Sequence, residues 1–222
     1  MVGFESCEPN IFESLPLILR CCRTLMVKAS PMIDIDHGCN QLKQVRDVNV
    51  YALNGECKEV VFVCAPSKEE TRVNCVDIHS SGNDDEFCFT RSMERESNLH
   101  LAGKMGRYIY EPNAAIMKAG PYALLTEDYE IEALAPNTHL YTSDEVVADF
   151  PGRSFEVLSE IKLSRSGVAS MLPDGKAHVI TRNYPVGAAE LQRQLGLKEG
   201  GEQYIVATTV GNRPCGFLCA RF

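Results

Sequence analysis

The sequence predicts an α/β fold in its first part and a small α+β fold at its end. Two observations support this prediction. Thr24–Ala29 is a short apolar run, and a short helical segment and a strand pair around Asn54-Gly55 follow it, an order typical of α/β proteins. From Phe155 onward, the pattern predicts elements in the order βαβαββ, which is typical of an open sheet with helices on one face.

The composition is that of a globular protein, because 45% of the 222 residues are apolar and 23% are charged. No run of 18 apolar residues and no secretory signal occur, so we expect a soluble, cytoplasmic protein without a membrane partner. The net charge of −8 is unevenly distributed. Residues 1–150 carry 13 basic and 24 acidic side chains, a net charge of −11, whereas residues 151–222 carry 9 and 6, a net charge of +3. The weakly basic end is therefore better suited to nucleic acid.

The first elements are a helix and a strand. Residues 9–22 predict an amphipathic helix with Asn10 as its cap. Its apolar stripe is formed by Ile11, Leu15, Ile18 and Leu19. Thr24–Ala29 is expected to be a strand buried on both faces, as in a parallel sheet, and to end at Pro31.

Two hairpins are predicted next. After a short helix at Gly38–Val45, Asn54-Gly55 is the strongest short-range hairpin signal and lies between the strands of residues 48–64. Val73–His79 and Glu86–Thr90 flank a second turn, and residues 93–106 read as a polar stretch.

Residues 108–120, YIYEPNAAIMKAG, predict a short helix with Pro112 in its first turn and Gly120 at its end. Residues 121–154 are rich in turn signals and are expected to connect two modules. The final module is predicted as strand Phe155–Lys162, helix 164–172, strand Ala177–Asn183, helix Ala188–Leu197, strand Gln203–Val210 and strand Cys215–Arg221.

The ten cysteines occur in apolar contexts without a repeated spacing, and we expect buried, reduced thiols rather than a disulfide scaffold. Cys215 and Cys219 are expected on one face of a strand, but no further ligand lies near them in the sequence, so no metal site is predicted. No cysteine is placed with a histidine and an orienting group, which argues against a cysteine-dependent enzyme.

Three stretches, together with FEVLSEIKLSR at residues 155–165, resemble a known family. They are CEPN…LMVKASPMIDID between Cys7 and Asp36, NGECKEVVF from Asn54 to Phe62, and YIYEPNAAIMKAG. They resemble bacterial proteins in which a class I S-adenosylmethionine-dependent methyltransferase domain precedes a small ferredoxin-like linker and a THUMP-like domain. The Bacteroidetes members are the most similar.

The resemblance implies a C-terminal remnant of a Rossmann-like methyltransferase sheet at residues 1–106, a ferredoxin-like linker region at 107–152 and a βαβαββ THUMP-like domain at 153–222. Thr24–Ala29 would be the fifth strand of that sheet, and the hairpin of residues 48–64 would be its last two. The family binds the methyl donor through a glycine-rich loop after a strand, and no such loop occurs here. We therefore expect S-adenosylmethionine to belong to the intact protein, and this chain alone neither to bind it nor to catalyse, with no catalytic residue of its own.

Substrate-side candidates lie in two places. Loops after strands line the ligand crevice of such a sheet, which points to Lys28, Ser30, Pro31 and Met32, with turn geometry and packing as the alternative. In the YEPN stretch, the polar candidates are Tyr110, Glu111 and Asn113, for which helix capping and packing are the alternative. Asp34 and Asp36 are interpreted as turn and capping residues.

The THUMP-like resemblance implies RNA as a partner, such as tRNA or rRNA. Basic side chains that could neutralise its phosphates are Lys162, Arg165, Lys176, Arg182, Arg193 and Lys198. Tyr184 could stack on a base or pack in the core. The alternative to an RNA methyltransferase portion is a non-catalytic structural module that forms a homodimer through an open sheet edge at Thr24–Ala29.

Overall fold

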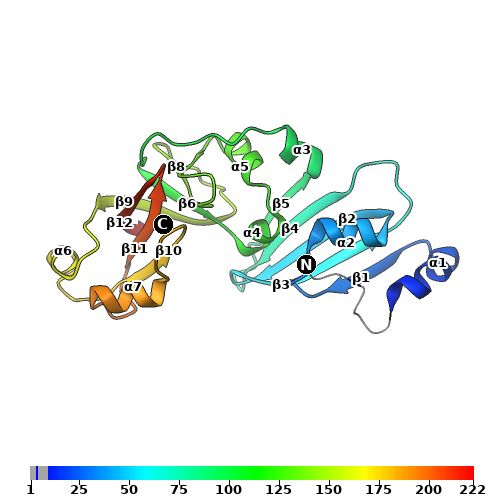
Figure 1. The fold of residues 1–222 in the computed structure, drawn as a ribbon, viewed down its shortest axis with the longest axis horizontal. Coiled ribbons are helices and arrows are strands. Elements are labelled where there is room, and N and C mark those ends of the chain that lie inside the picture. Colours follow the sequence, from blue (N-terminus) through cyan, green and yellow to red (C-terminus); the bar gives the residue numbers. More distant parts are fainter. Residues whose placement is uncertain (1–3, 5–9) are drawn as a thin grey trace. The chain divides into compact units, whose positions relative to one another are not determined.

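The computed structural model of the protein describes Phe4 and residues 10–222. These residues form two compact units. The first comprises the described residues up to Glu96 together with Asn113–Pro121, and the second comprises Ser97–Pro112 and Tyr122–Phe222. The chain thus returns once to the first unit before it completes the second (Figure 1).

The first unit is built on a five-stranded sheet with the order β1-β3-β2-β4-β5. Only β2 and β4 pair in parallel, so the sheet is mixed. Its elements are α1 (Ile11–Cys21), β1 (Leu25–Ala29), α2 (Ile35–Leu42), β2 (Val45–Leu53), β3 (Glu56–Cys64), β4 (Arg72–Ile78), β5 (Asp85–Thr90), α3 (Arg91–Glu96) and α4 (Ala114–Ala119).

Local signals in the first unit are confirmed where a single residue determines the backbone. Asn54 and Gly55 join β2 to β3 with φ angles of 50° and 81°, the left-handed pair that a two-residue hairpin turn of type I′ requires. The cap residues are confirmed as well. The side chains of Asn10, Asp34 and Asn113 accept hydrogen bonds from the first turns of α1, α2 and α4.

One prediction for the first unit is wrong. β1 is an edge strand that pairs antiparallel with β3, and Val27 is its single buried residue, while Met26 is 67% exposed. A short apolar run does not reveal which faces are covered, because that depends on partners distant in the sequence. The polar stretch of residues 93–106 begins within α3, which ends at Glu96.

The second unit is built on a seven-stranded sheet with the order β10-β11-β12-β9-β6-β8-β7. It is also mixed, because β10 and β11 pair in parallel. Its elements are β6 (Tyr108–Pro112), α5 (Tyr122–Asp128), β7 (Glu132–Ala133), β8 (Tyr141–Ser143), β9 (Gly152–Glu160), α6 (Arg165–Met171), β10 (His178–Thr181), α7 (Ala188–Leu195), β11 (Gln203–Val210) and β12 (Arg213–Arg221).

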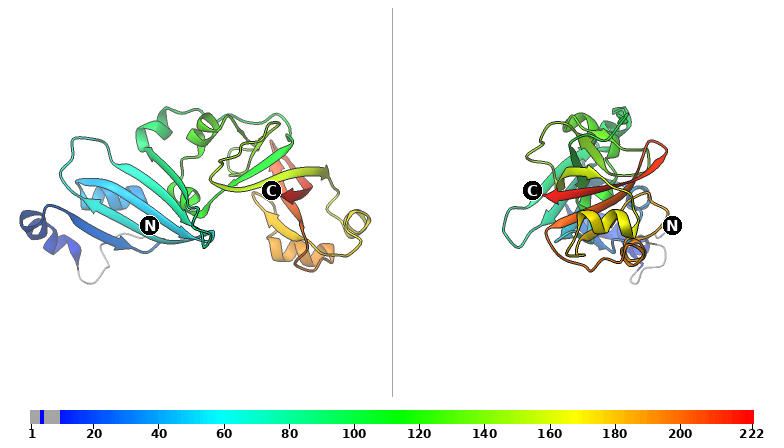
Figure 2. Two further views of the ribbon diagram at one scale, coloured as in Figure 1. Left: turned by 180° about the vertical axis from the view of Figure 1, so that it is seen from behind. Right: turned by 90° about the vertical axis from the view of Figure 1, so that its left-hand side faces the viewer.

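The βαβαββ order of the last part is confirmed, and its two helices cover one face of the sheet (Figure 2). Val168 of α6 and Leu191 of α7 pack with Ile205 and Leu218, whereas Val206 and Phe217 face the opposite core. Alternate residues of β11 and β12 therefore belong to different cores, as the two-residue period of a strand requires.

Residues 121–154 are not a connector between separate modules. They contain α5, β7 and β8, and β8 pairs with β6, which pairs in turn with β9. β9 also pairs with β12, so one continuous sheet runs through the whole second unit. None of the helices in the described part of the chain is both long and apolar enough to cross a membrane.

The nine cysteines that the structure describes are free thiols, as expected, but not all of them are buried. Cys21, Cys22 and Cys88 are exposed, because α1 has no buried residue and because Cys88 lies on the outer face of β5. Burial raises the pKa of Cys75 to about 12 and that of Cys219 to about 12. These two thiols therefore stay protonated near neutral pH and behave as small apolar side chains.

Candidate functional site

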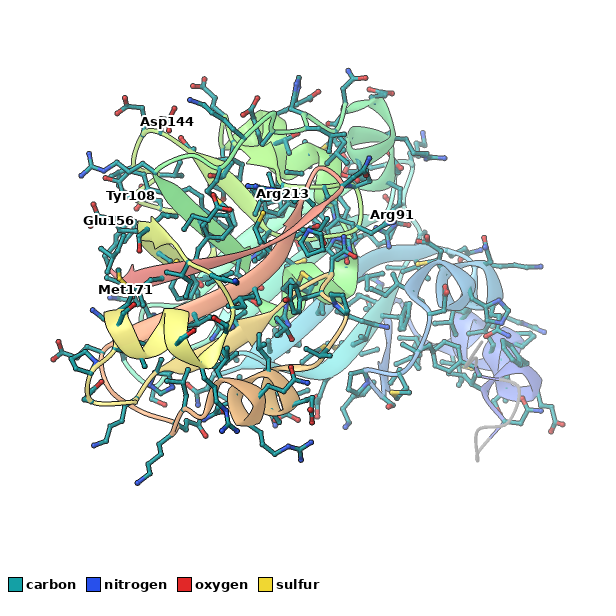
Figure 3. The ribbon with its side chains drawn as sticks, turned by 60° about the vertical axis from the view of Figure 1, so that its left-hand side comes forward. Arg91, Tyr108, Asp144, Glu156, Met171 and Arg213 are labelled. Atoms are coloured by element: carbon teal, nitrogen blue, oxygen red, sulfur yellow. The ribbon has the colours of Figure 1, made fainter. Side chains whose placement is uncertain are left out.

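Basic side chains gather around the helix layer of the second unit. Lys176 and Lys198 are parallel partners in an isolated β-bridge, so these two exposed lysines are neighbours although 22 positions apart. Arg165, at the start of α6, donates from Nε to the carbonyl oxygen of Gln194 at the end of α7, over 2.9 Å. Lys162 lies just before α6 and is exposed. Nitrogen-tipped side chains extend from this layer to solvent in Figure 3, where Met171 marks α6.

Ion pairing divides the six candidate RNA contacts. Within the described part of the chain, Lys162, Lys176 and Lys198 form no ion pair. Arg193 pairs with Glu190 on α7, and Arg182 pairs with Glu111, with 2.6 Å between Nη2 and Oε1. Arg182 follows the last residue of β10, whereas Lys176 precedes the first, so the two lie near different ends of this strand. The three lysines and Arg165 are therefore the cations most available to phosphate.

Tyr184, the candidate for stacking on a base, packs against the core beneath the helices.

Tyr110 and Glu111 of β6 are buried and have partners within the protein. The Tyr110 hydroxyl donates to the carbonyl oxygen of Glu145 over 3.1 Å and accepts from the amide of Val147 over 2.9 Å. Glu111, 2% exposed, accepts from Nε of Arg153 over 2.8 Å and pairs with Arg182. The alternative interpretation, packing, therefore describes their environment.

Asn113 is the N-cap of α4, and its Oδ1 accepts from the amide of Ile116 over 3.0 Å. Gly120 ends that helix in a left-handed conformation, with φ of 82°. Glu111 does not cap the helix, because its carboxylate is held by arginines. Pro112 is the last residue of β6 rather than part of the helix.

The loop after β1 places its candidate side chains differently. Ser30 and Pro31 form a tight turn in which the amide of Ile33 donates to the Ser30 carbonyl oxygen over 3.0 Å, with proline at the position that suits its fixed φ. Met32 is 72% exposed. Lys28 is exposed on β1 and donates from Nζ to Oε1 of Glu59 over 2.9 Å. Of the four candidates in β1 and the loop after it, Lys28, Ser30 and Met32 are therefore exposed.

A pocket of about 510 Å³ in the first unit was not predicted from the sequence. It lies among α2, β4 and α3, and its charged lining comes from Asp36, Glu70, Arg91, Glu94 and Arg95. The spacing of four between the two arginines would have indicated one helical face, had the helix been recognised.

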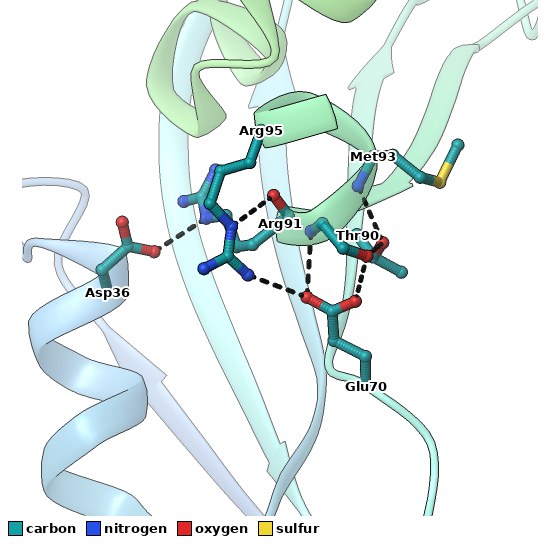
Figure 4. Close-up of polar contacts among 7 residues, drawn as sticks. Asp36, Glu70, Thr90, Arg91, Met93 and Arg95 are labelled. Carbon is teal, nitrogen blue, oxygen red and sulfur yellow. Dashed lines mark hydrogen bonds and ion pairs between the residues drawn. The ribbon is translucent and has the colours of Figure 1, made fainter. Parts of the chain in front are cut away.

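Arg91 and Arg95 are both engaged at the rim of this pocket (Figure 4). Arg91 donates from Nε to Oδ1 of Asp36 over 2.7 Å and from Nη1 to the carbonyl oxygen of Ala119 over 2.7 Å. Arg95 donates to the carbonyl oxygen of Arg91, and its Nη2 lies 3.6 Å from Oε1 of Glu70. These contacts connect α3 to α2 and to the end of α4.

The pocket has no reactive thiol. Burial, reinforced by the negative charge of Asp36, raises the pKa of Cys39 to about 11, so its nucleophilic thiolate is scarce near neutral pH. Hydrogen bonds from Ser92 hold the pKa of Glu70 below its usual value. The pocket is therefore a mixed-charge depression that suits a polar ligand better than covalent catalysis.

Comparison with known proteins identifies two regions of the chain. Residues 108–151 match the model of a ferredoxin-like domain, and residues 152–221 match the model of a domain described as THUMP domain-like. Both resemblances inferred from the sequence are confirmed at this level. No curated protein matches the chain.

One solved structure is similar to the whole chain. It is the crystal structure of a "putative methyltransferase" from Porphyromonas gingivalis W83, with a TM-score of 0.91 and 26% sequence identity. The similarity covers 100% of this chain and 57% of that one, so the chain spans little more than half the length of this relative.

Proposed function

We propose that this chain is the C-terminal, substrate-binding portion of an S-adenosylmethionine-dependent RNA methyltransferase of the class I type, related to the Bacteroidetes proteins. The observation that supports the proposal most is the likeness to the P. gingivalis protein, because it extends over the whole chain together with a THUMP domain-like region. Residues 1–106 would end the methyltransferase domain.

The topology of the first sheet is consistent with this role. β3 lies antiparallel between β1 and β2, so that the strand pair following α2 adds onto β1 instead of forming a sheet of its own. The other side of β1 is an edge to which preceding strands of a longer protein could pair. Because the sequence contains no glycine-rich motif of the donor-binding type, we propose that S-adenosylmethionine binds elsewhere in the longer protein.

The proposed RNA contact is the helix layer of the second unit. Lys162, Lys176 and Lys198 carry charges that no carboxylate within the described residues neutralises, and Arg165 lies beside them. Phosphate contacts of this kind supply affinity without sequence readout. The shape of a structured RNA would then determine which molecule binds. Lys28, Ser30 and Met32 remain the proposed substrate-side contacts of the first unit.

RNA binding is tested by fluorescence anisotropy with a labelled, transcribed tRNA between 50 and 200 mM salt. The double variant Lys176→Ala/Lys198→Ala is expected to weaken binding about tenfold and to reduce the slope of log K against log salt by about 1.5, because two phosphate contacts are lost.

The matched control is Lys68→Ala/Lys104→Ala, which removes the same charge from exposed positions outside the helix layer. Equal weakening in both double variants would show that only net charge matters, and the proposed surface would then be wrong. Saturable binding of S-adenosylmethionine to this chain in calorimetry would contradict the proposal that the methyl donor binds elsewhere in the longer protein.

The exposed edge at β1 favours one alternative, a non-catalytic homodimeric module. Met26 is 67% exposed on this edge, and unpaired strand edges template association. If the edge mediates dimerisation, light scattering will give a mass that rises from monomer to dimer with concentration, and Met26→Lys will keep the chain monomeric. A wild-type monomer at the highest concentration would dispose of this alternative.

A further inference from the structure

Two carboxylates and an imidazole meet at one end of the β4–β5 hairpin in the first unit. Asp77 of β4 and Asp85 of β5 are directly opposite each other in the strand register. His79 follows β4, and its Nε2 lies 3.3 Å from Oδ2 of Asp85. One ligand atom from each of the three residues lies within 4.8 Å of those from the other two.

Asp77 is a buried carboxylate without a cation. Its exposed fraction is 2%, and it points to the same sheet face as Val73 and Cys75, which are also buried. Among the residues that the structure describes, the one hydrogen bond to its side chain comes from the amide of Gly55, over 3.3 Å. Within the described part of the chain, no basic side chain forms an ion pair with it. An unpaired charge in such a place is costly.

The other buried carboxylates show what Asp77 lacks. Asp47 is 6% exposed and lies between Arg46 and Arg72, at 2.6 and 2.9 Å. Burial opposes its ionisation, but the two guanidinium groups outweigh this and hold the pKa of Asp47 below its usual value. Glu111 is paired with two arginines in the same way. A positive charge at Asp77 would complete the pattern.

Asp85 makes the need for positive charge greater. Like charges directly opposite each other on neighbouring strands repel, and here both carboxylates face one imidazole. The surrounding backbone already holds the three groups together. The amide of His79 donates to Oδ1 of Asp84 over 3.0 Å, and the amide of Asn54 donates to the carbonyl oxygen of Ile78 over 3.1 Å. The ligands are therefore positioned by two adjoining turns.

We propose that Asp77, His79 and Asp85 bind a divalent transition metal ion, with Zn²⁺ as the best match. One imidazole nitrogen and two carboxylate oxygens form a ligand set that zinc accepts, and water would complete its coordination. The bound ion neutralises Asp77 and Asp85 together and links β4 to β5. This inference is independent of the proposed RNA methyltransferase role.

The test is metal titration of the chelator-treated chain. Calorimetry with Zn²⁺ is expected to show one site at these residues, and an ion concentration of 100 times Kd should raise the Tm of the first unit by roughly 12 °C. Co²⁺ provides a second probe. Its visible spectrum should show nitrogen and oxygen ligands without thiolate charge transfer, which separates this site from the exposed Cys21 and Cys22.

Single substitutions test whether these three residues bind the zinc ion. His79→Ala and Asp85→Asn should both abolish the zinc-dependent rise in Tm, whereas His100→Ala, a control at an exposed histidine beside Glu127, should preserve it. Asp77→Asn should raise the Tm of the metal-free chain, because it removes the buried charge, and should eliminate the response to zinc.

Two results would overturn the proposal. One is zinc binding that survives in both His79→Ala and Asp85→Asn. The other is a chelator-treated chain that shows neither Zn²⁺ binding in calorimetry nor a zinc-dependent rise in Tm.

Discussion

Replacing both Arg153 and Arg182 with alanine is expected to lower the free energy of unfolding by about 3–5 kcal/mol, the cost of leaving a buried charge without its partners. The charge is that of Glu111, which is 2% exposed in β6. Arg153 is the second residue of β9, and Arg182 follows β10. The Glu111 carboxylate therefore connects β6, β9 and the end of β10 in the second unit. Urea unfolding followed by circular dichroism measures the loss.

A matched control separates burial from charge. Arg107 and Arg213 also pair with glutamates, Glu156 and Glu160, but at exposed positions. The double variant Arg107→Ala/Arg213→Ala should cost less than about 1 kcal/mol, since surface pairs contribute little. Adding Glu111→Met to the Arg153→Ala/Arg182→Ala background should recover most of the stability. If this triple variant is no more stable than the double variant, the buried charge is not the cause.

Phe155→Ala is expected to destabilise the second unit by about 3–5 kcal/mol, the usual cost of truncating a buried phenylalanine. Phe155 is 1% exposed in β9, and its ring centroid lies 5.1 Å from that of Tyr204. Its backbone pairs with Ile109 of β6 on one side and with Arg221 of β12 on the other. We therefore expect hydrogen exchange to accelerate on both sides of β9 at once.

The matching substitution in the first unit is Phe89→Ala, also 1% exposed and in β5. It should accelerate exchange in β4 and β5 and leave β6 and β12 unchanged, since these strands belong to the other sheet. Faster exchange confined to β6 and β8 in Phe155→Ala, with β10–β12 still protected, would show that the seven-stranded sheet is not one cooperative structure.

Local chemistry explains which parts of the fold could be predicted. Asn54-Gly55 specifies its turn because few other residue pairs adopt two consecutive left-handed conformations. Asn113 and Gly120 determine where α4 begins and ends, because they are its N-cap and C-cap. The βαβαββ order followed from periodicity and turn residues. The direction and edge position of β1 could not be predicted, because they depend on pairing with β3, more than thirty residues away.

The candidate sites divide along the same line. Exposed lysines can be recognised one at a time, so Lys162, Lys176 and Lys198 were identified from the sequence, although their unpaired state was not. The pairing of Arg182 with Glu111 spans 71 positions, so the sequence could not show that this candidate has a carboxylate partner. Asp77, His79 and Asp85 were missed because their meeting depends on the register of a hairpin. Nonlocal geometry decides which polar residues become partners and which stay available.

The shared strand β9 also constrains how such a protein can change by recombination. The two matched regions meet between residues 151 and 152, immediately before or at the start of the strand that hydrogen-bonds to both. A recombination crossover there would separate β6 from β9 and leave each fragment with an unpaired strand edge. A strand from another protein would then have to match the hydrogen-bonding register of that edge. The ferredoxin-like and THUMP-like regions are consequently expected to be inherited together. Substitutions in β9 and in the strands paired with it are expected to be correlated.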